Sequence, residues 1–275
     1  MSGYLTYTEF HNQSMIAKDV DPAVICLKYL ADRFELNLEQ RYWIAFLYGT
    51  CYCAPTTFYM YNEFPDYQKT DINRMVKWWN AKKDKLVFQT DRLRIKSNDQ
   101  FVESFISYKS LVKNNQQKYF VSKSWQEIYK KIEAIKYFGR FTLFNYLDVL
   151  NQITDVNHKP TYLNMIEAES CRKGLCFAIK KDDWVDKKLS SNMAKILHNE
   201  FIKILNTHSG NIFQIETTLC SYKKYRWDKR YVGFYIDRMY NEIKKLESSI
   251  NDGVAWECLW QFRKETFDQK YLIEK

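Results

Sequence analysis

The sequence has few of the residues that make tight turns. Its 275 residues include only 7 glycines and 4 prolines. A chain with so few turn-forming residues favours long helices over closely spaced hairpins. Charged residues make up 27% of the chain and aromatic residues 17%. This composition argues against a disordered polypeptide and predicts a sizeable hydrophobic core.

Several chemical motifs are missing as well. The sequence has no Walker loop, no Gly-x-Gly-x-x-Gly turn, no His-Glu-x-x-His pair and no nucleophile elbow, so it matches none of the enzyme classes that those motifs define. The 7 cysteines are an odd number without zinc-ligand spacing, and the 4 histidines are scattered. We expect reduced thiols that pack as small apolar side chains. No run of about 18 apolar residues and no apolar leader is present, so we expect neither a membrane span nor a signal peptide.

The charge balance is basic. The chain has 42 Lys and Arg against 33 Asp and Glu, a formal net charge of +9. Such a surface attracts polyanions such as nucleic acid. A lysine-rich surface that only keeps the protein soluble would give the same charge, and the cationic residues are spread along the chain without a basic tail.

Helical spacing runs through most of the sequence and predicts an all-α fold. We expect a loosely held N-terminal arm over residues 1–20, then a single compact multi-helix catalytic domain over residues 21–275, with a short extended or loop segment near 86–96. Asn37 resembles an N-cap, and Gln40 completes a capping box. The predicted helices start at Pro22 and near residue 38, continue after Asp71, and then cover residues 124–150, 187–206, 212–227, 231–247 and 254–266.

An aromatic helical stretch covers residues 41–66. Arg41, Ala45, Tyr48 and Tyr52 stand at i, i+4, i+7 and i+11, so they share one predicted helix face. A guanidinium and two phenols can bind anions and stack on flat rings. A buried amphipathic helix whose tyrosines reach toward water explains the same pattern.

A second cationic segment covers residues 89–94. Arg92 and Arg94 alternate with apolar residues, which predicts two guanidiniums on one side of an extended segment. Two such forks can hold two phosphate oxygens. An edge strand with solvated charges is the alternative.

The richest segment covers residues 216–238. Glu216, Cys220 and Lys223 share a predicted helix face, with Lys224 beside them, which could be a base next to an anion clamp or an ion pair without function. Tyr231, Tyr235 and Arg238 are predicted to share the next helix face. Cations interleaved with aromatic rings suit a splayed nucleotide. The segment Tyr137–Phe141, which contains Gly139 and Arg140, has the same composition.

These stretches resemble the bacteriophage amino acid:DNA transferase family, also called the α-glutamyl/putrescinyl thymine pyrophosphorylase family. The resemblance covers roughly residues 20–272. It rests on residues 39–49 (EQRYWIAFLYG), 54–57 (APTT), 62–66 (NEFPD), 89–94 (QTDRLR), 137–141 (YFGRF), 170–176 (SCRKGLC), 216–224 (ETTLCSYKK) and 230–238 (RYVGFYIDR).

The resemblance implies an enzyme of DNA hypermodification. Its substrate would be double-stranded phage DNA that carries pyrophosphorylated 5-hydroxymethyluracil, in the cytoplasm of the infected bacterial host. A small amine, an amino acid such as glycine or a polyamine, would displace pyrophosphate and give a hypermodified thymine. The chemistry needs no organic cofactor. It is compatible with a divalent metal on the pyrophosphate, but no ligand motif indicates one.

Roles follow from that chemistry. A carboxylate base would deprotonate the amine, and the candidates are Glu216, Asp66 and Asp91. Cations would hold the pyrophosphate and DNA, and the candidates are Arg41, Arg92, Arg94, Arg140, Lys223, Lys224 and Arg238. Rings would stack on the extruded base, and the candidates are Tyr48, Tyr52 and Tyr235. The alternatives are a non-enzymatic helical DNA-binding protein and a glycosylase-like enzyme that acts on a flipped base. The sequence indicates neither the amine nor the oligomeric state.

Overall fold

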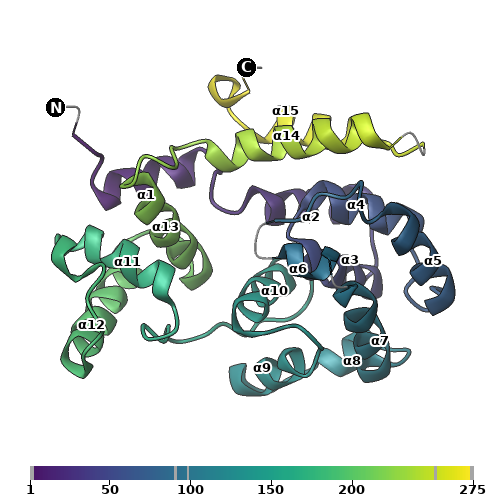
Figure 1. The fold of residues 1–275 in the computed structure, drawn as a ribbon, viewed down its shortest axis with the longest axis horizontal. Coiled ribbons are helices and arrows are strands. Elements are labelled where there is room, and N and C mark those ends of the chain that lie inside the picture. The colour runs from purple at the N-terminus through teal and green to yellow at the C-terminus, as the bar shows by residue number, and fades with distance from the viewer. Residues whose placement is uncertain (1–2, 90–91, 98, 251–252, 273–275) are drawn as a thin grey trace. The chain divides into compact units, whose positions relative to one another are not determined.

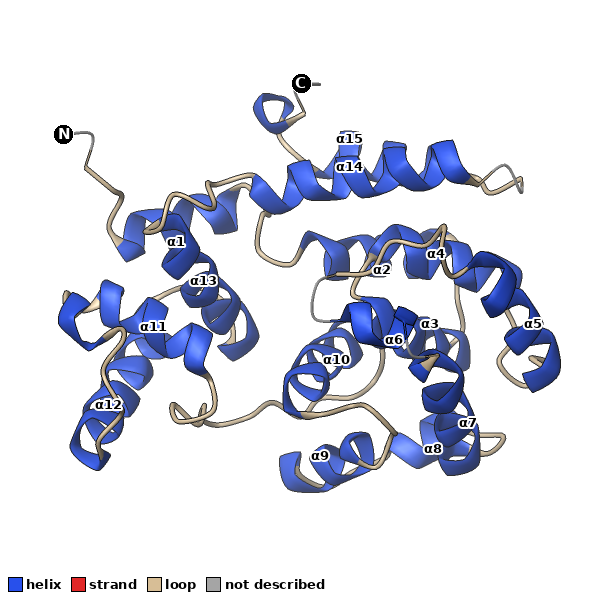
Figure 2. Ribbon diagram, in the orientation of Figure 1, coloured by secondary structure: helices blue, strands red, loops and turns tan. Residues whose placement is uncertain are grey.

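The structure is a computed structural model that describes residues 3–89, 92–97, 99–250 and 253–272. Over these residues it contains fifteen α-helices and no strand (Figures 1 and 2). The prediction of an all-α fold is confirmed. Among the described helices, none has the length and apolar character needed to cross a bilayer.

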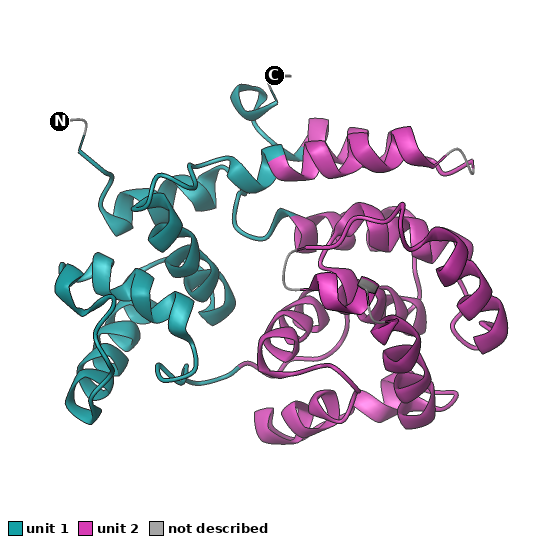
Figure 3. Cartoon of the chain, in the orientation of Figure 1, with its two compact units in different colours: residues 1–22, 160–237, 266–275 teal, residues 23–159, 238–265 magenta. Residues whose placement is uncertain are grey.

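The chain divides into two compact units, each assembled from separate stretches of sequence (Figure 3). Unit 1 contains residues 1–22, 160–237 and 266–275, and unit 2 contains residues 23–159 and 238–265. The single catalytic domain expected after residue 20 stays a prediction.

Unit 2 is built around helix α3 (Leu38–Cys51). Its N-terminus has the predicted capping box, because the Asn37 side chain accepts the Gln40 N–H and the Gln40 side chain accepts the Asn37 N–H. The other helices of unit 2 are α2 (Pro22–Arg33, from Ala23 on), α4 (Ala54–Glu63), α5 (Ile72–Lys82), α6 (Leu93–Ser97), α7 (Gln100–Val112), α8 (Gln116–Phe120), α9 (Trp125–Glu133), α10 (Arg140–Ile153), most of α14 (Phe234–Ser249) and nearly all of α15 (Glu257–Thr266).

Aromatic rings fill the core of unit 2. Trp43 and Phe46 of α3 are completely buried. The Phe46 ring stacks on Tyr108 of α7 with a centroid distance of 4.0 Å, and on Phe138 at 5.7 Å. Such ring contacts stabilise the core beyond their buried area, so the aromatic stretch at 41–66 first of all builds the core.

Unit 1 is built around the crossing of α11 (Glu169–Ala178) and α13 (Ile212–Tyr225). Gly174 of α11 makes the crossing possible, because a Cβ at this position would lie 1.9 Å from the Leu219 carbonyl oxygen of α13. The remaining elements are α1 (Tyr7–Ile16), α12 (Ser191–Thr207) and the 3₁₀ turns η2 (Asp182–Trp184) and η3 (Gln269–Tyr271).

The first twenty residues differ from the expected loosely held arm. Residues 7–16 form α1, which begins with a capping box between Thr6 and Glu9. Tyr7 is buried, and its hydroxyl lies 2.9 Å from the Thr218 hydroxyl of α13. Helix α1 is therefore a packed part of unit 1.

The predicted helix over 124–150 is wrong, because the chain forms α9 and α10 with a break between them. The backbone at Lys136 leaves the helix, since its N–H donates to the Ser107 hydroxyl and its carbonyl accepts from Ser104. Gly139 is the N-cap of α10, and a Cβ there would meet nothing within 4 Å. Gly139 is therefore not a site of close helix packing, in contrast to Gly174.

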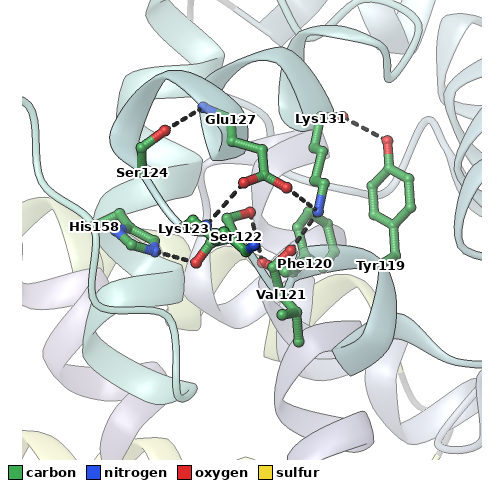
Figure 4. A network of polar contacts seen from close by, with 9 residues as sticks. All are labelled: Tyr119, Phe120, Val121, Ser122, Lys123, Ser124, Glu127, Lys131 and His158. Atoms are coloured by element: carbon green, nitrogen blue, oxygen red, sulfur yellow. Dashed lines mark hydrogen bonds and ion pairs between the residues drawn. The ribbon is translucent and has the colours of Figure 1, made fainter.

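A polar network holds the start of α9 (Figure 4). Ser124 caps the helix through the Glu127 N–H, and the Glu127 carboxylate accepts the Lys123 N–H at 2.8 Å and pairs with Lys131 at 3.2 Å. A ring nitrogen of His158 lies 2.7 Å from the Ser122 carbonyl oxygen. These contacts satisfy the backbone groups of this loop and indicate a structural role.

Candidate active site

In unit 2, three of the sequence segments on which the family resemblance rests meet at the guanidinium of Arg92. This side chain is only 3% exposed. Its Nη1 donates to the Tyr137 carbonyl at 3.0 Å, and its Nη2 donates to the Gly49 carbonyl at 2.8 Å. The guanidinium also lies over the rings of Tyr52 and Phe138, with centroid distances of 5.0 and 5.3 Å. Arg92 therefore ties together segments 39–49, 89–94 and 137–141.

The predicted pairing of Arg92 with Arg94 on one side is wrong. Residues 93–97 form α6. Of the segment near 86–96 that we expected to be extended or a loop, residues 87–89 are irregular and follow a turn at 83–86. A helical step of about 100° per residue turns positions i and i+2 away from each other. Arg94 is accordingly exposed while Arg92 is buried.

The predicted helix face from Arg41 to Tyr52 stops one residue short of Tyr52, because α3 ends at Cys51. Arg41 joins α3 to α2, because it pairs with Asp32 at 2.8 Å and donates to the Leu36 carbonyl at 2.9 Å. Tyr48 and Tyr52 are only 8% and 4% exposed. Tyr52 is the C-cap of α3 with a left-handed backbone, so it lies past the end of the predicted face.

The remaining candidates of unit 2 are Asp66, Asp91, Arg140 and Arg238. Asp66 accepts the N–H groups of Gln68 and Lys69 and pairs with Lys69; these contacts outweigh partial burial and lower the pKa of Asp66. Arg140 is exposed at the start of α10. Arg238 pairs with Glu242 on α14 at 3.4 Å. Asp91 lies outside the described residues.

In unit 1, Glu216, Cys220 and Lys223 follow one another along α13, as the sequence predicts. The Cys220 thiol donates to Glu216 Oε1 at 3.2 Å, and burial together with that carboxylate raises the pKa of the thiol. The Lys223 ammonium donates to the Ser170 hydroxyl of α11 at 2.6 Å. Segment 170–176 thus meets segment 216–224 at this point.

The last turn of α13 and the residues that follow it carry a cationic and aromatic surface, which we define as Lys223, Lys224, Trp227, Lys229 and Arg230. Trp227 is 38% exposed, and the ammonium groups of Lys223 and Lys229 lie 5.3 and 5.7 Å from its ring centroid. Burial and the nearby cations Lys173 and Arg230 lower the pKa of Lys223. An anionic ligand would relieve this repulsion between like charges.

Tyr235 reaches this region through Arg230. The Arg230 Nη1 donates to the Ser221 hydroxyl of α13 at 2.9 Å and also to the Tyr235 hydroxyl, and the guanidinium lies 4.5 Å from the Tyr235 ring centroid. The predicted face of Tyr231, Tyr235 and Arg238 is wrong for Tyr231, because α14 begins only at Phe234 and Gly233 turns the chain with a φ of +101°.

Two polar residues near this turn, Ser14 and Asp19, were not singled out from the sequence. Asp19 accepts the backbone N–H groups of Gly233, Tyr235 and Ile236 at 2.8 to 3.1 Å. Ser14 and Arg230 line the same small pocket as Asp19. No local motif marks Ser14 or Asp19, whereas Arg230 is the first residue of the segment 230–238 on which the resemblance rests. Within the described residues, no group of three or more His, Cys, Asp or Glu side chains is placed to bind a metal.

Comparison with known proteins gives the family. The model of the amino acid:DNA transferase family matches residues 17–230. The chain belongs to the amino acid:DNA transferase family. It is also similar to a protein of Salmonella phage ViI named serinyltransferase, with 26% identity over 316 aligned positions that cover 98% of this chain and 73% of that protein.

Membership of this family makes the chain an enzyme that transfers an amino acid to DNA. The matched residues include the whole of α11 and α13 and end at Arg230. They therefore contain both the Arg92 cluster of unit 2 and the whole of the cationic and aromatic surface of unit 1.

Proposed function

We propose that this amino acid:DNA transferase joins the amine of an amino acid to pyrophosphorylated 5-hydroxymethyluracil in phage DNA, in the cytoplasm of the infected host. The observation that carries the proposal is the meeting of segments 170–176, 216–224 and the start of 230–238 in unit 1, in a chain of this family. The meeting place combines cations for an anionic leaving group with a carboxylate at Glu216.

The reaction balances without a further reagent. The nitrogen lone pair of the neutral amine forms a bond to the 5-methylene carbon, and the bond from that carbon to the pyrophosphate oxygen breaks. Pyrophosphate leaves with the electron pair, and the nitrogen loses a proton to a carboxylate base. Glu216 is our candidate for that base, and Lys223 and Lys224 are our candidates for stabilising the charge on the leaving group.

The target base has to leave the DNA stack to react. The exposed ring of Trp227 is a stacking surface with two ammonium groups beside it. Base stacking on an aromatic side chain combined with phosphate contacts from lysines is the usual way to hold a splayed nucleotide. Trp227 therefore joins Tyr235 as a candidate for this role.

The test is incubation of the protein with DNA that carries pyrophosphorylated 5-hydroxymethyluracil and with pooled amino acids and polyamines. Mass spectrometry of the digested nucleosides identifies the product, and pyrophosphate release is followed in the same samples. We expect release only when an amine is present, together with one new nucleoside whose mass reports the amine. Serine, glycine, glutamate and putrescine belong in the pool.

The other outcomes separate the alternatives. Binding of the DNA with neither pyrophosphate release nor a new nucleoside would indicate a non-enzymatic DNA-binding protein. Abasic sites would indicate a glycosylase-like enzyme. DNA with unmodified 5-hydroxymethyluracil is the matched control, and a product from this DNA would contradict the need for a pyrophosphate leaving group.

A further inference from the structure

The Lys223 ammonium of unit 1 has a neutral hydrogen-bond acceptor. It lies half-buried near the end of α13 and donates to the Ser170 hydroxyl of α11 at 2.6 Å. The neighbouring Lys173 differs, because its ammonium pairs with the carboxylates of Glu169 and Asp186 at 3.1 Å each. A hydroxyl carries no charge, so the contact with Ser170 does not neutralise Lys223. An ammonium has three N–H donors, and two remain beside the one that Ser170 accepts.

The register of two crossing helices brings Ser170 to Lys223 (Figure 1). A Cβ at Gly174 of α11 would lie 1.9 Å from the Leu219 carbonyl oxygen of α13, so the two backbones touch at this point. Ser170 precedes Gly174 by four residues, and Lys223 follows Leu219 by four. Residues four apart lie on the same face of a helix. One turn away from the backbone contact, the two side chains therefore face each other, and the crossing itself fixes their position.

The Trp227 ring limits the ammonium as well. The Lys223 Nζ lies 5.3 Å from the centroid of this exposed ring, within the range of a cation–π contact. The hydroxyl of Ser170 and the ring thus hold one long and otherwise flexible side chain. Lysine has about 2 kcal/mol of rotamer entropy to lose, so contacts that order it in advance reduce the cost of using it on a ligand.

The charges around Lys223 favour an anionic ligand. Burial is the largest cause that lowers the pKa of this ammonium, and the nearby cations lower it further. An anion at the ammonium would offset both effects. The charged and titratable groups that face Lys223 are Glu169 and Lys173 on α11, Cys220 on α13, and Lys229 and Arg230 after α13.

We propose that Ser170 is a positioning residue, which holds the Lys223 ammonium so that it stabilises the charge on the leaving pyrophosphate. When the bond from the 5-methylene carbon to the pyrophosphate oxygen breaks, that oxygen keeps the electron pair. Lys223 donates one of its remaining N–H groups to the pyrophosphate and stays protonated. A donor that is in place beforehand stabilises such charge without reorganisation. The inference rests on the proposed function and adds Ser170 to the residues that serve it.

The first experiment measures binding without turnover. The DNA-free protein is titrated calorimetrically with inorganic pyrophosphate. Ser170→Ala should weaken binding about tenfold, as expected when a hydrogen bond to a charged group is lost. Ser170→Thr keeps the hydroxyl and should restore most of the affinity. Ser191→Ala is the matched control, because Ser191 is an exposed serine at the start of α12 in the same unit, and it should bind as the wild type does.

A double-mutant cycle tests whether Ser170 acts through Lys223. Lys223→Gln should weaken pyrophosphate binding at least as much as Ser170→Ala does. Adding Ser170→Ala to Lys223→Gln should then have little further effect, because the group that Ser170 positions is already missing. The Lys223→Gln arm keeps the test valid even if Ser170→Ala does not fold.

The second experiment measures transfer kinetics with pyrophosphorylated DNA as a function of pH. Lys223 has to be protonated to act, so the wild-type rate should fall at high pH through the pKa of this ammonium. The hydrogen bond to Ser170 favours the charged form. Ser170→Ala should therefore move the falling limb to lower pH and reduce kcat about tenfold, with the KM for DNA unchanged. Ser170→Thr should return the limb toward its wild-type position. A merely structural serine would lower the thermal midpoint and leave the limb where it is.

The outcomes separate this inference from the proposed function. Pyrophosphate binding that depends on the pair of Ser170 and Lys223, in a protein that releases no pyrophosphate with any amine, would support the positioning of Lys223 and contradict the proposed chemistry. Amine-dependent release with wild-type pyrophosphate binding and an unmoved limb in Ser170→Ala would overturn this inference alone. Additive effects in the double-mutant cycle would also overturn it, since Ser170 would then act without Lys223.

Discussion

Gly174 of α11 packs directly against the Leu219 backbone of α13, because a Cβ at Gly174 would lie 1.9 Å from the Leu219 carbonyl oxygen. A backbone carbonyl cannot move aside as the end of a flexible side chain can, so the new methyl group in Gly174→Ala has to push α11 away from α13. We expect a loss of stability of at least about 1–3 kcal/mol, the usual range for overpacking. Chemical denaturation measures it, with Gly3→Ala as the control, since a Cβ at Gly3 meets nothing within 4 Å. Equal midpoints for the two variants would contradict this close crossing.

Arg92 and Arg94 are expected to respond differently to alanine. Arg92→Ala removes the donors to the Gly49 and Tyr137 carbonyls, and unpaired buried carbonyls cost about 1–3 kcal/mol each. Arg94 is exposed, so Arg94→Ala should keep the fold. Thermal unfolding should show a lower midpoint for Arg92→Ala and little change for Arg94→Ala. If Arg94 stabilises the leaving group, its variant should lose about two to three orders of magnitude in turnover, and near-normal turnover would indicate a solvated charge.

Local signals allowed much of the fold to be predicted. The capping box of Asn37 and Gln40 and the N-cap Asp71 are each a contact over three residues, and both are present. The break before α10 was missed because apolar spacing continues through Ile135 and Phe138. Hydrogen bonds between the Lys136 backbone and the side chains of the distant Ser104 and Ser107 stabilise that break. No local sequence pattern predicts these contacts.

The candidate site was harder to predict from the sequence for the same reason. The sequence places Glu216, Cys220 and Lys223 on one face because a helix repeats every 3.6 residues. Whether Arg92 faces solvent depends on carbonyls 43 and 45 residues away. The Ser14 pocket depends on α1 packing against α13, more than 200 residues later. Such contacts are set by tertiary packing, so spacing alone does not indicate them.

Glu242 should make unit 2 less stable as the pH rises. Burial raises the pKa of this carboxyl, and the Arg238 cation opposes the rise only in part. With a folded-state pKa above the unfolded one, the folded protein holds the proton more tightly, so this group favours folding at low pH. That stability is lost as the pH rises through the folded-state pKa. Denaturation of the wild type and Glu242→Gln from pH 4 upwards should show the variant gaining relative stability, and a constant difference would contradict this.

DNA binding should depend steeply on salt. The net charge of +9 and the cationic and aromatic surface at the end of α13 predict release of counterions on binding. In a plot of log affinity against log salt concentration, Lys224→Gln should reduce the slope by about one if this lysine contacts a phosphate. Trp227→Ala should weaken binding by about 1–3 kcal/mol with an unchanged slope, because stacking releases no counterions. A flat response to salt in the wild type would exclude this surface as a phosphate contact.

Glu216→Gln tests the base. In the wild type, a carboxylate that deprotonates the incoming ammonium must itself be ionised, so the rate should rise with pH through the pKa of that carboxyl. The amide keeps the shape and still faces the Cys220 thiol, which donates to Glu216 Oε1 at 3.2 Å, but it cannot accept the proton. The rising limb should therefore flatten and the maximal rate should fall. If Glu216 is only an intrahelical charge partner, worth about 0.2–0.5 kcal/mol, the variant should melt slightly lower and turn over normally.

An unchanged profile would move the assignment to Asp66, Asp91 or Asp19, of which Asp19 has a pKa raised to about 6 by burial. A rising limb near pH 6 that survives in Glu216→Gln would identify Asp19 among the three.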